Sequence, residues 1–224
     1  MLEKYLQIFA KLRTDKNSKF WSALTCYQAP HKPFVLLSVM DLIAQSQIVT
    51  NFIQPSLELV ETFNLYWAAI MPLGTKGNMA YPFPRLKSDG FWHLVPNPGF
   101  ETKIDMDFSS MTRLRQVCAG AKMDEELFGC LYNPEARARS RAFLINTYFV
   151  LEVRPLVEEQ GKINYDAYQY SQTLLKMAEP EAQYGEGRGE GDFWSEGHDD
   201  SPTNGLALCR LCHWSFDEGL MSVG

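Results

Sequence analysis

The stretch NGLALCRLCHWSFDEGL, residues 204–220, decides the architecture of the C-terminal part of the chain. Its first two residues, Asn204 and Gly205, are a turn signal, and a short apolar run follows them. Cys209 and Cys212 are separated by two residues, a spacing at which two thiolates can bind one zinc ion. His213 comes next, at the expected start of a short helix. The stretch therefore predicts a small metal-binding unit.

This pattern resembles the second half of an HNH nuclease, whose fold is a β-hairpin and a helix around one metal ion. The elements Asn-Gly-Leu-x-Leu-Cys and His-x-x-Phe-Asp-x-Gly-Leu carry the resemblance. It implies that His213 binds the catalytic metal and that Asn204 orients the loop carrying the general base. It also implies a divalent metal, Mg²⁺ or Mn²⁺, for cleavage. A structural zinc bound by Cys209, Cys212 and His213 is a further possibility.

The first half of such a unit has no counterpart in this sequence. An HNH site needs an earlier His as general base, and zinc-bearing members carry an earlier Cys-x-x-Cys pair; we find neither upstream of Ser201. His198 lies only six residues before Asn204, too close for the opposing strand. The glycine-rich segment 185–192 occupies the place of the first hairpin. The unit is either degenerate or shortened there, and two cysteines without a bound metal are an open alternative.

Composition limits the function classes. The chain has 224 residues and a net charge of −6. Residues 1–154 hold 17 Lys and Arg against 14 Asp and Glu, a net +3, whereas residues 155–224 hold 4 against 13, a net −9. This asymmetry favours an anionic partner for the N-terminal part. Five scattered cysteines argue against a disulfide framework, and we find no apolar run long enough for a membrane span. We expect a cytoplasmic protein.

The hydrophobic pattern predicts an α+β protein with a mainly helical N-terminal domain. The expected helices are residues 2–13, 33–46, 56–71, 109–118, 124–131, 134–148 and 165–178. Two aromatic runs, residues 81–86 and 90–94, flank a Ser-Asp-Gly turn and predict a short β-hairpin. Asn133 and Pro134 form a cap and first-turn pair for the helix 134–148. Residues 155–163 read as a linker, and a partial ββα-metal (HNH) domain follows.

Three N-terminal segments together carry a second resemblance. They are APHKP at 29–33, YPFPRLKSDGFW at 81–92 and YNP at 132–134, the last before a basic helix. In this order, ahead of an HNH segment, they look like the sulfur-binding domain of phosphorothioate-dependent McrA-type restriction endonucleases. That family binds DNA whose backbone carries sulfur in place of one non-bridging oxygen, and its HNH domain then cuts nearby. The resemblance spans residues 20–150.

The resemblance implies a DNA-binding surface of basic and aromatic side chains. Lys and Arg supply most of the affinity for phosphates, and a helix N-terminus favours an anion. A sulfur is more weakly hydrated than an oxygen, so a wall of Tyr81, Phe83, Tyr132 and Pro134 would discriminate between them. Packing in the core is the alternative role of these aromatic residues. Arg137 and Arg141 share one helix side at i, i+4 spacing. The candidate DNA-binding residues are His31, Lys32, Tyr81, Phe83, Arg85, Tyr132, Asn133, Pro134, Arg137 and Arg141.

Taken together, these patterns divide the chain into three parts. Residues 1–155 are the expected sulfur-binding domain, residues 156–200 a linker with the degenerate or missing hairpin, and residues 201–224 the HNH segment. The favoured function is a modification-dependent endonuclease that recognises phosphorothioate DNA. The alternatives are a non-catalytic binder of such DNA with a decayed HNH tail, and an HNH nuclease that reads another modification or none. The expected partner is double-stranded DNA, and a homodimer is possible.

Overall fold

The computed structural model describes residues 1–104 and 106–178 of the chain. The chain divides into two units, residues 1–180 and 181–224. The described part is mostly helical and carries one two-stranded antiparallel sheet, which confirms the α+β class. No described helix is both long enough and apolar enough to cross a membrane.

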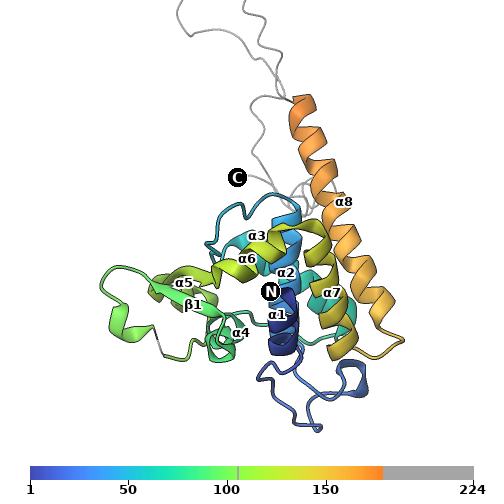
Figure 1. The fold of residues 1–224 in the computed structure, drawn as a ribbon, viewed down its shortest axis with the longest axis horizontal. Helices are drawn as coiled ribbons and strands as arrows, with labels where there is room; N and C mark the ends of the chain where they lie inside the picture. The colour runs from blue at the N-terminus through green and yellow to red at the C-terminus, as the bar shows by residue number, and fades with distance from the viewer. Residues whose placement is uncertain (105, 179–224) are drawn as a thin grey trace, which may run out of the picture. The chain divides into compact units, whose positions relative to one another are not determined.

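Helix α2, His31–Ala44, is the centre of this part. Its residues Lys32–Ile43 are all buried, so the helix is covered on every side, as expected for a helix without a polar face. It packs against α3 (Leu57–Ile70), α7 (Pro134–Tyr148) and α8 (Arg154–Ala178). Figure 1 shows α7 and α8 side by side, with the C-terminal end of α8 extending past the other helices.

The remaining helices complete the shell. Helix α1, Leu2–Phe9, packs against α6, Glu125–Tyr132, and against α7. The short helices are α4 (Pro82–Arg85) and α5 (Met111–Val117), with 3-10 turns η1 (Ala23–Thr25), η2 (Leu86–Asp89) and η3 (Glu101–Lys103). Asn133 caps α7 as predicted, because its side-chain oxygen accepts the N–H of Ala136 at 3.0 Å.

The predicted hairpin at 81–94 is wrong in its first half. Tyr81 leads into α4 and η2 instead of a strand, because Pro82 takes the first helical position, where its fixed φ fits. The strand that does form is β1, Trp92–Pro96, and its partner is β2, Cys118–Met123. The register pairs Trp92 with Met123 and is interrupted between Val95 and Pro96. Sheet pairing here is therefore non-local.

The predicted linker at 155–163 is also wrong in its local structure. Helix α8 runs without interruption through this segment. Pro155 is the second residue of α8, where a missing N–H costs no helical hydrogen bond. Val157, Gly161 and Asn164 are buried against the domain, so α8 belongs to the N-terminal packing unit. The functional boundary proposed at residue 155 stays a prediction.

Candidate functional site

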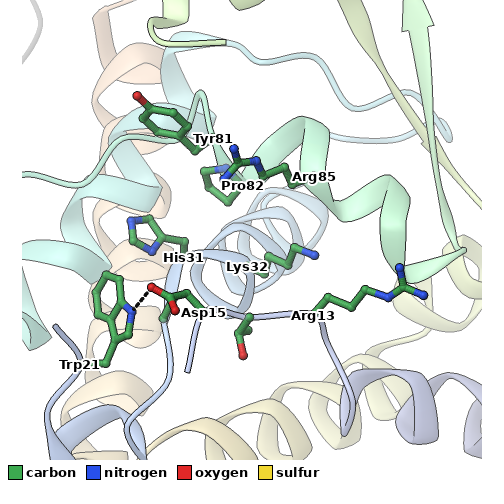
Figure 2. Close-up of a pocket in the computed structure, with 10 residues that line it drawn as sticks. Arg13, Asp15, Trp21, His31, Lys32, Tyr81, Pro82 and Arg85 are labelled. Carbon is green, nitrogen blue, oxygen red and sulfur yellow. Dashed lines mark hydrogen bonds between the residues drawn. The ribbon is translucent and has the colours of Figure 1, made fainter. Parts of the chain in front are cut away.

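A cavity of about 250 Å³ opens between the loop after α1, the start of α2, and α4. Its lining joins three separate segments of the sequence, including APHKP and the start of YPFPRL. Figure 2 shows the rings of Trp21, His31 and Tyr81 along one side of the view, with Lys32 and Arg13 extending toward the other side. The lining residues are Arg13, Thr14, Asp15, Trp21, Ala29, His31, Lys32, Tyr81, Pro82 and Arg85.

The apolar side of the cavity depends on His31. Its ring lies 5.2 Å from the Trp21 ring in an edge-on arrangement and 4.7 Å from the ring of Trp67, measured between centroids. Burial lowers the pKa of His31 to about 4, and the Asp15 carboxylate offsets only part of this effect. The imidazole is therefore neutral at physiological pH. It acts as a largely uncharged ring between two indoles.

Lys32 mainly forms contacts within the protein. Its ammonium group donates to Asp89 Oδ2 at 2.6 Å and to Ser88 Oγ at 3.1 Å. Both partners of the Lys32–Asp89 ion pair are almost fully buried. Burial lowers the pKa of Lys32, whereas Asp89 opposes this change. The pair ties α2 to η2, so much of the lysine charge is already compensated inside the protein.

Two arginines provide the accessible positive charge of the cavity. The guanidinium of Arg85 lies over the Tyr81 ring, 5.6 Å from its centroid, and pairs with Asp107 at 2.9 Å. Both side chains of this ion pair are more than half exposed, so the pair is weak and solvent-screened. Arg13 is exposed, and its backbone N–H donates to Asp89 at 2.8 Å. An incoming anion could therefore engage both guanidinium groups at little cost.

One acidic side chain also lines the cavity. The Asp15 carboxylate accepts the indole N–H of Trp21 at 2.9 Å and the backbone N–H of Asn17 at 3.0 Å. Both of its oxygens thus have donors from the same loop. This carboxylate organises the loop, and its charge sets a limit on how strongly the cavity attracts an anion.

The four predicted wall residues do not form one wall. Tyr81 lines the 250 Å³ cavity, but Phe83 is fully buried and packs edge-on against Trp92 at 5.3 Å. The helical turn of α4 explains this difference, because residues two apart point to different sides of a helix, whereas in a strand Tyr81 and Phe83 would share one face. Pro134 lines a different cavity, and Tyr132 is an exposed residue packed against Phe128.

The second cavity, of about 400 Å³, lies between α2, α7 and α8. Arg137 and Arg141 both line it, which confirms that they share one side of α7. Arg137 donates to the carbonyl oxygens of Leu131 and Tyr132, at 2.8 and 3.1 Å, and so satisfies the end of α6. Arg139 points elsewhere and pairs with Glu3 at 2.6 Å on the surface.

Arg141 belongs to a buried polar network. It donates to Asp41 Oδ1 at 2.5 Å and to the hydroxyl of Tyr66. The other oxygen of Asp41 accepts the Tyr66 hydroxyl at 2.7 Å and the Asn164 side chain at 2.8 Å. Burial raises the pKa of Asp41, and the charge of Arg141 acts in the opposite direction. The network joins α2, α3, α7 and α8, and this gives Arg141 a structural role.

The structure does not test the positions of the predicted nuclease residues. Asn204, Cys209, Cys212 and His213 lie outside the described residues. Within residues 1–104 and 106–178, no group of three or more His, Cys, Asp or Glu side chains could hold a metal ion. The three described cysteines are free thiols; Cys118 is buried, whereas Cys26 and Cys130 are partly exposed.

Comparison with known proteins bears on both units. Residues 181–224 match the HNH endonuclease family. Among solved structures, the chain resembles the sulfur-binding domain of SprMcrA complexed with phosphorothioated DNA, with a TM-score of 0.53 and 18% sequence identity. The match covers 74% of this chain and 96% of that domain. The described part shares its fold with that domain. Both resemblances drawn from the sequence are thus confirmed, and no curated protein matches the chain.

Six residues of the cavity lining were absent from the sequence-derived set: Arg13, Thr14, Asp15, Trp21, Ala29 and Pro82. Pro82 stands inside the YPFPRL segment, which was assigned to the first strand of the predicted hairpin. Trp21 belongs to a loop with no periodic pattern. Arg13 is the last residue of the predicted helix 2–13, but α1 ends at Phe9, so Arg13 lies in the loop as well. Nothing in the spacing of these two residues relates them to His31. Only the packing of Trp21 against the His31 ring brings that loop to the cavity.

Proposed function

We propose that the protein is a modification-dependent DNA endonuclease whose N-terminal unit binds phosphorothioate DNA through the 250 Å³ cavity. The observation that carries this proposal is the joint lining of one cavity by neutral rings and by exposed arginines. The sulfur-binding fold of the described part supports it. The HNH match of residues 181–224 supports a nuclease role for the C-terminal unit.

The chemistry of the cavity suits a sulfur-bearing diester better than an ordinary one. Both diesters carry one negative charge, which Arg13 and Arg85 would meet at the cavity edge. Against the neutral rings of His31 and Trp21, an oxygen would lose hydration that those rings cannot replace. A larger and weakly hydrated sulfur loses less. We therefore assign the ring side to the sulfur and the arginine side to the non-bridging oxygen.

This proposal changes which of the predicted DNA-binding residues are expected to contact the modified phosphate. His31, Tyr81 and Arg85 become the principal contacts, with Lys32 fixing the position of α2 from behind. Arg137 and Arg141 already have protein partners, so direct DNA contacts from them are the weaker version of the proposal. Tyr132, Asn133 and Pro134 remain candidates for contacts to a more distant part of the duplex.

The cleavage step would belong to residues 181–224. If this unit is catalytically active, Asn204 and His213 would act with a divalent metal such as Mg²⁺ or Mn²⁺, which polarises the scissile phosphate. Cys209 and Cys212 would hold a structural zinc, with His213 as the predicted third ligand. We propose a restriction role from the resemblance, and a homodimer as the oligomeric state. A non-catalytic binder of phosphorothioate DNA is the second candidate, favoured by the missing general base.

The deciding experiment compares an ordinary oxygen duplex with the two diastereomers of the phosphorothioate duplex, each of which differs from it in one atom. Fluorescence anisotropy of the full chain, at one salt concentration, should show tighter binding of the phosphorothioate duplex than of the oxygen duplex. Both diastereomers at phosphorus need testing, because only one presents sulfur to the ring side. Equal affinity for all three duplexes would refute the proposed readout. Tight but equal binding would favour the third reading, an HNH nuclease that does not sense sulfur.

A further inference from the structure

The loop between α1 and α2 presents a phenylalanine to solvent beside the cavity. The side chain of Phe20 is 74% exposed, while Trp21, the next residue, lines the cavity. A single exposed apolar residue is common and by itself needs no explanation. Phe20 is different because of what holds it in place and what surrounds it.

The loop has a defined shape. Asn17 accepts the backbone N–H of Lys19 on its side chain at 3.1 Å, and its carbonyl oxygen accepts the N–H of Phe20 at 2.9 Å. Asp15 binds the indole of Trp21, and its own carbonyl oxygen accepts the N–H of Ala29 at 2.8 Å. These bonds connect the two arms of the loop. Phe20 is therefore held outward at little further entropy cost on binding.

The charges around Phe20 fit a nucleic acid. Lys16 and Lys19 are exposed residues of the same loop, and Arg13 lies at the cavity. The one carboxylate of this segment, Asp15, is occupied by donors of the loop itself. Cations beside an outward aromatic ring are the arrangement by which proteins contact phosphates and insert an apolar wedge between bases.

We propose that Phe20 packs against the nucleotide next to the phosphorothioate, entering the groove of duplex DNA when the modified phosphate occupies the cavity. This inference rests on the proposed function and assigns a reading element to it. Phe20 is then a specificity-determining residue.

The test uses the full chain with Phe20→Ala and Phe20→Tyr, and Tyr170→Ala as the matched control. Tyr170 is a 56% exposed aromatic residue on α8, and Figure 1 shows the C-terminal end of α8 and the loop after α1 at opposite ends of the view. Phe20→Ala should weaken binding to the phosphorothioate duplex by about 5- to 100-fold, the range expected for loss of one aromatic stack. Phe20→Tyr should retain most of the affinity, and Tyr170→Ala should bind like the wild type.

Two further measurements distinguish packing of the Phe20 ring between bases, a wedge, from a purely structural role of this residue. Because Phe20→Ala removes no charge, the salt dependence of binding should keep its slope, whereas Lys19→Ala should lower the slope by about one. The fluorescence of 2-aminopurine placed beside the modified phosphate should rise on binding of the wild type and should not rise with Phe20→Ala. Circular dichroism of each variant confirms the fold.

The outcomes distinguish this inference from the proposed function. Wild-type preference for the phosphorothioate duplex, together with unchanged affinity of Phe20→Ala, would overturn the wedge and leave the cavity intact. Loss of the wild-type preference itself would overturn the proposed function. A 2-aminopurine signal that persists in Phe20→Ala would also overturn the wedge.

Discussion

Gly161 of α8 faces the guanidinium of Arg141 of α7 so closely that a Cβ atom at position 161 would overlap it. The missing side chain leaves the space through which Arg141 reaches Asp41 and Tyr66. Asn164, one turn further along α8, donates to the same Asp41 carboxylate at 2.8 Å. The approach of α8 to the domain therefore depends on a glycine and on one buried carboxylate.

Replacing Gly161 by alanine tests this relationship. In an ordinary helix interior the change stabilises by about 1 kcal/mol, because alanine is the better helix former. Here it should destabilise by about 1–3 kcal/mol, the usual cost of overpacking. Gly129→Ala in α6 is the matched control, since no heavy atom lies within 4 Å of its added Cβ, and it should stabilise. Urea denaturation measures both; equal shifts in the two variants would contradict the packing argument.

Breaking the Asp41–Arg141 pair should lower the free energy of unfolding strongly. Arg141→Met leaves a buried carboxylate without its cation, and loss of one partner of a buried pair costs about 3–5 kcal/mol. The surface pair of Arg139 and Glu3 is the contrast, because Arg139→Ala should cost at most about 1 kcal/mol. A double substitution, Asp41→Leu with Arg141→Met, should recover part of the loss. A small effect of Arg141→Met on unfolding would contradict this structural role.

The arginines of the two cavities should differ in a salt titration. Arg85→Ala should weaken DNA binding and lower the slope of log affinity against log salt by about one, as for one lost phosphate contact. Arg137→Ala should leave that slope unchanged, because its guanidinium binds the carbonyl groups at the end of α6. The reverse result would restore the helix α7 face as the main phosphate-binding surface.

His31 predicts a defined pH dependence of stability. Its pKa is about 4 in the folded chain against 6.5 ordinarily, so between these values only the unfolded chain takes up the proton. Stability from this residue is therefore complete above pH 6.5 and is lost as the pH falls toward 4, by about 1–3 kcal/mol for this partly exposed ring. Thermal unfolding between pH 5 and 7 should show a shallower pH dependence in His31→Phe than in the wild type. Parallel curves would contradict the burial argument.

The nuclease unit carries a separate prediction. The 224-residue chain should bind DNA but cleave it weakly with Mg²⁺ or Mn²⁺, because a missing acid–base group typically costs about 10² to 10⁴ in rate. Restoring a His-bearing hairpin ahead of Asn204 should raise the cleavage rate, and His213→Ala should abolish the gain. Robust cleavage by the present chain, lost in His213→Ala, would show that another residue acts as the base, with His198 the first to test.

Local signals in the sequence predicted two of the helices closely. Helices 56–71 and 134–148 agree with α3 and α7 within one residue at each end, because apolar periodicity and the Asn133–Pro134 cap act within a few residues. The same local signals misled where proline was ambiguous. Pro82 was compatible with an edge strand and with a first helical turn, and the chain adopts the turn. Pro155 likewise opens a helix where a linker was expected.

The sequence by itself determined which chemistry the chain carries: the order of APHKP, YPFPRL and the HNH segment, and the basic and aromatic residues within them. Tertiary structure alone decided which of those residues meet. It brought His31, Tyr81 and Arg85 to one cavity with Trp21, turned Phe83 into the core, and gave Arg141 a buried partner on α2. The physical reason is that these contacts join residues tens of positions apart, where burial and charge compensation decide the outcome and neighbouring residues carry no signal of it.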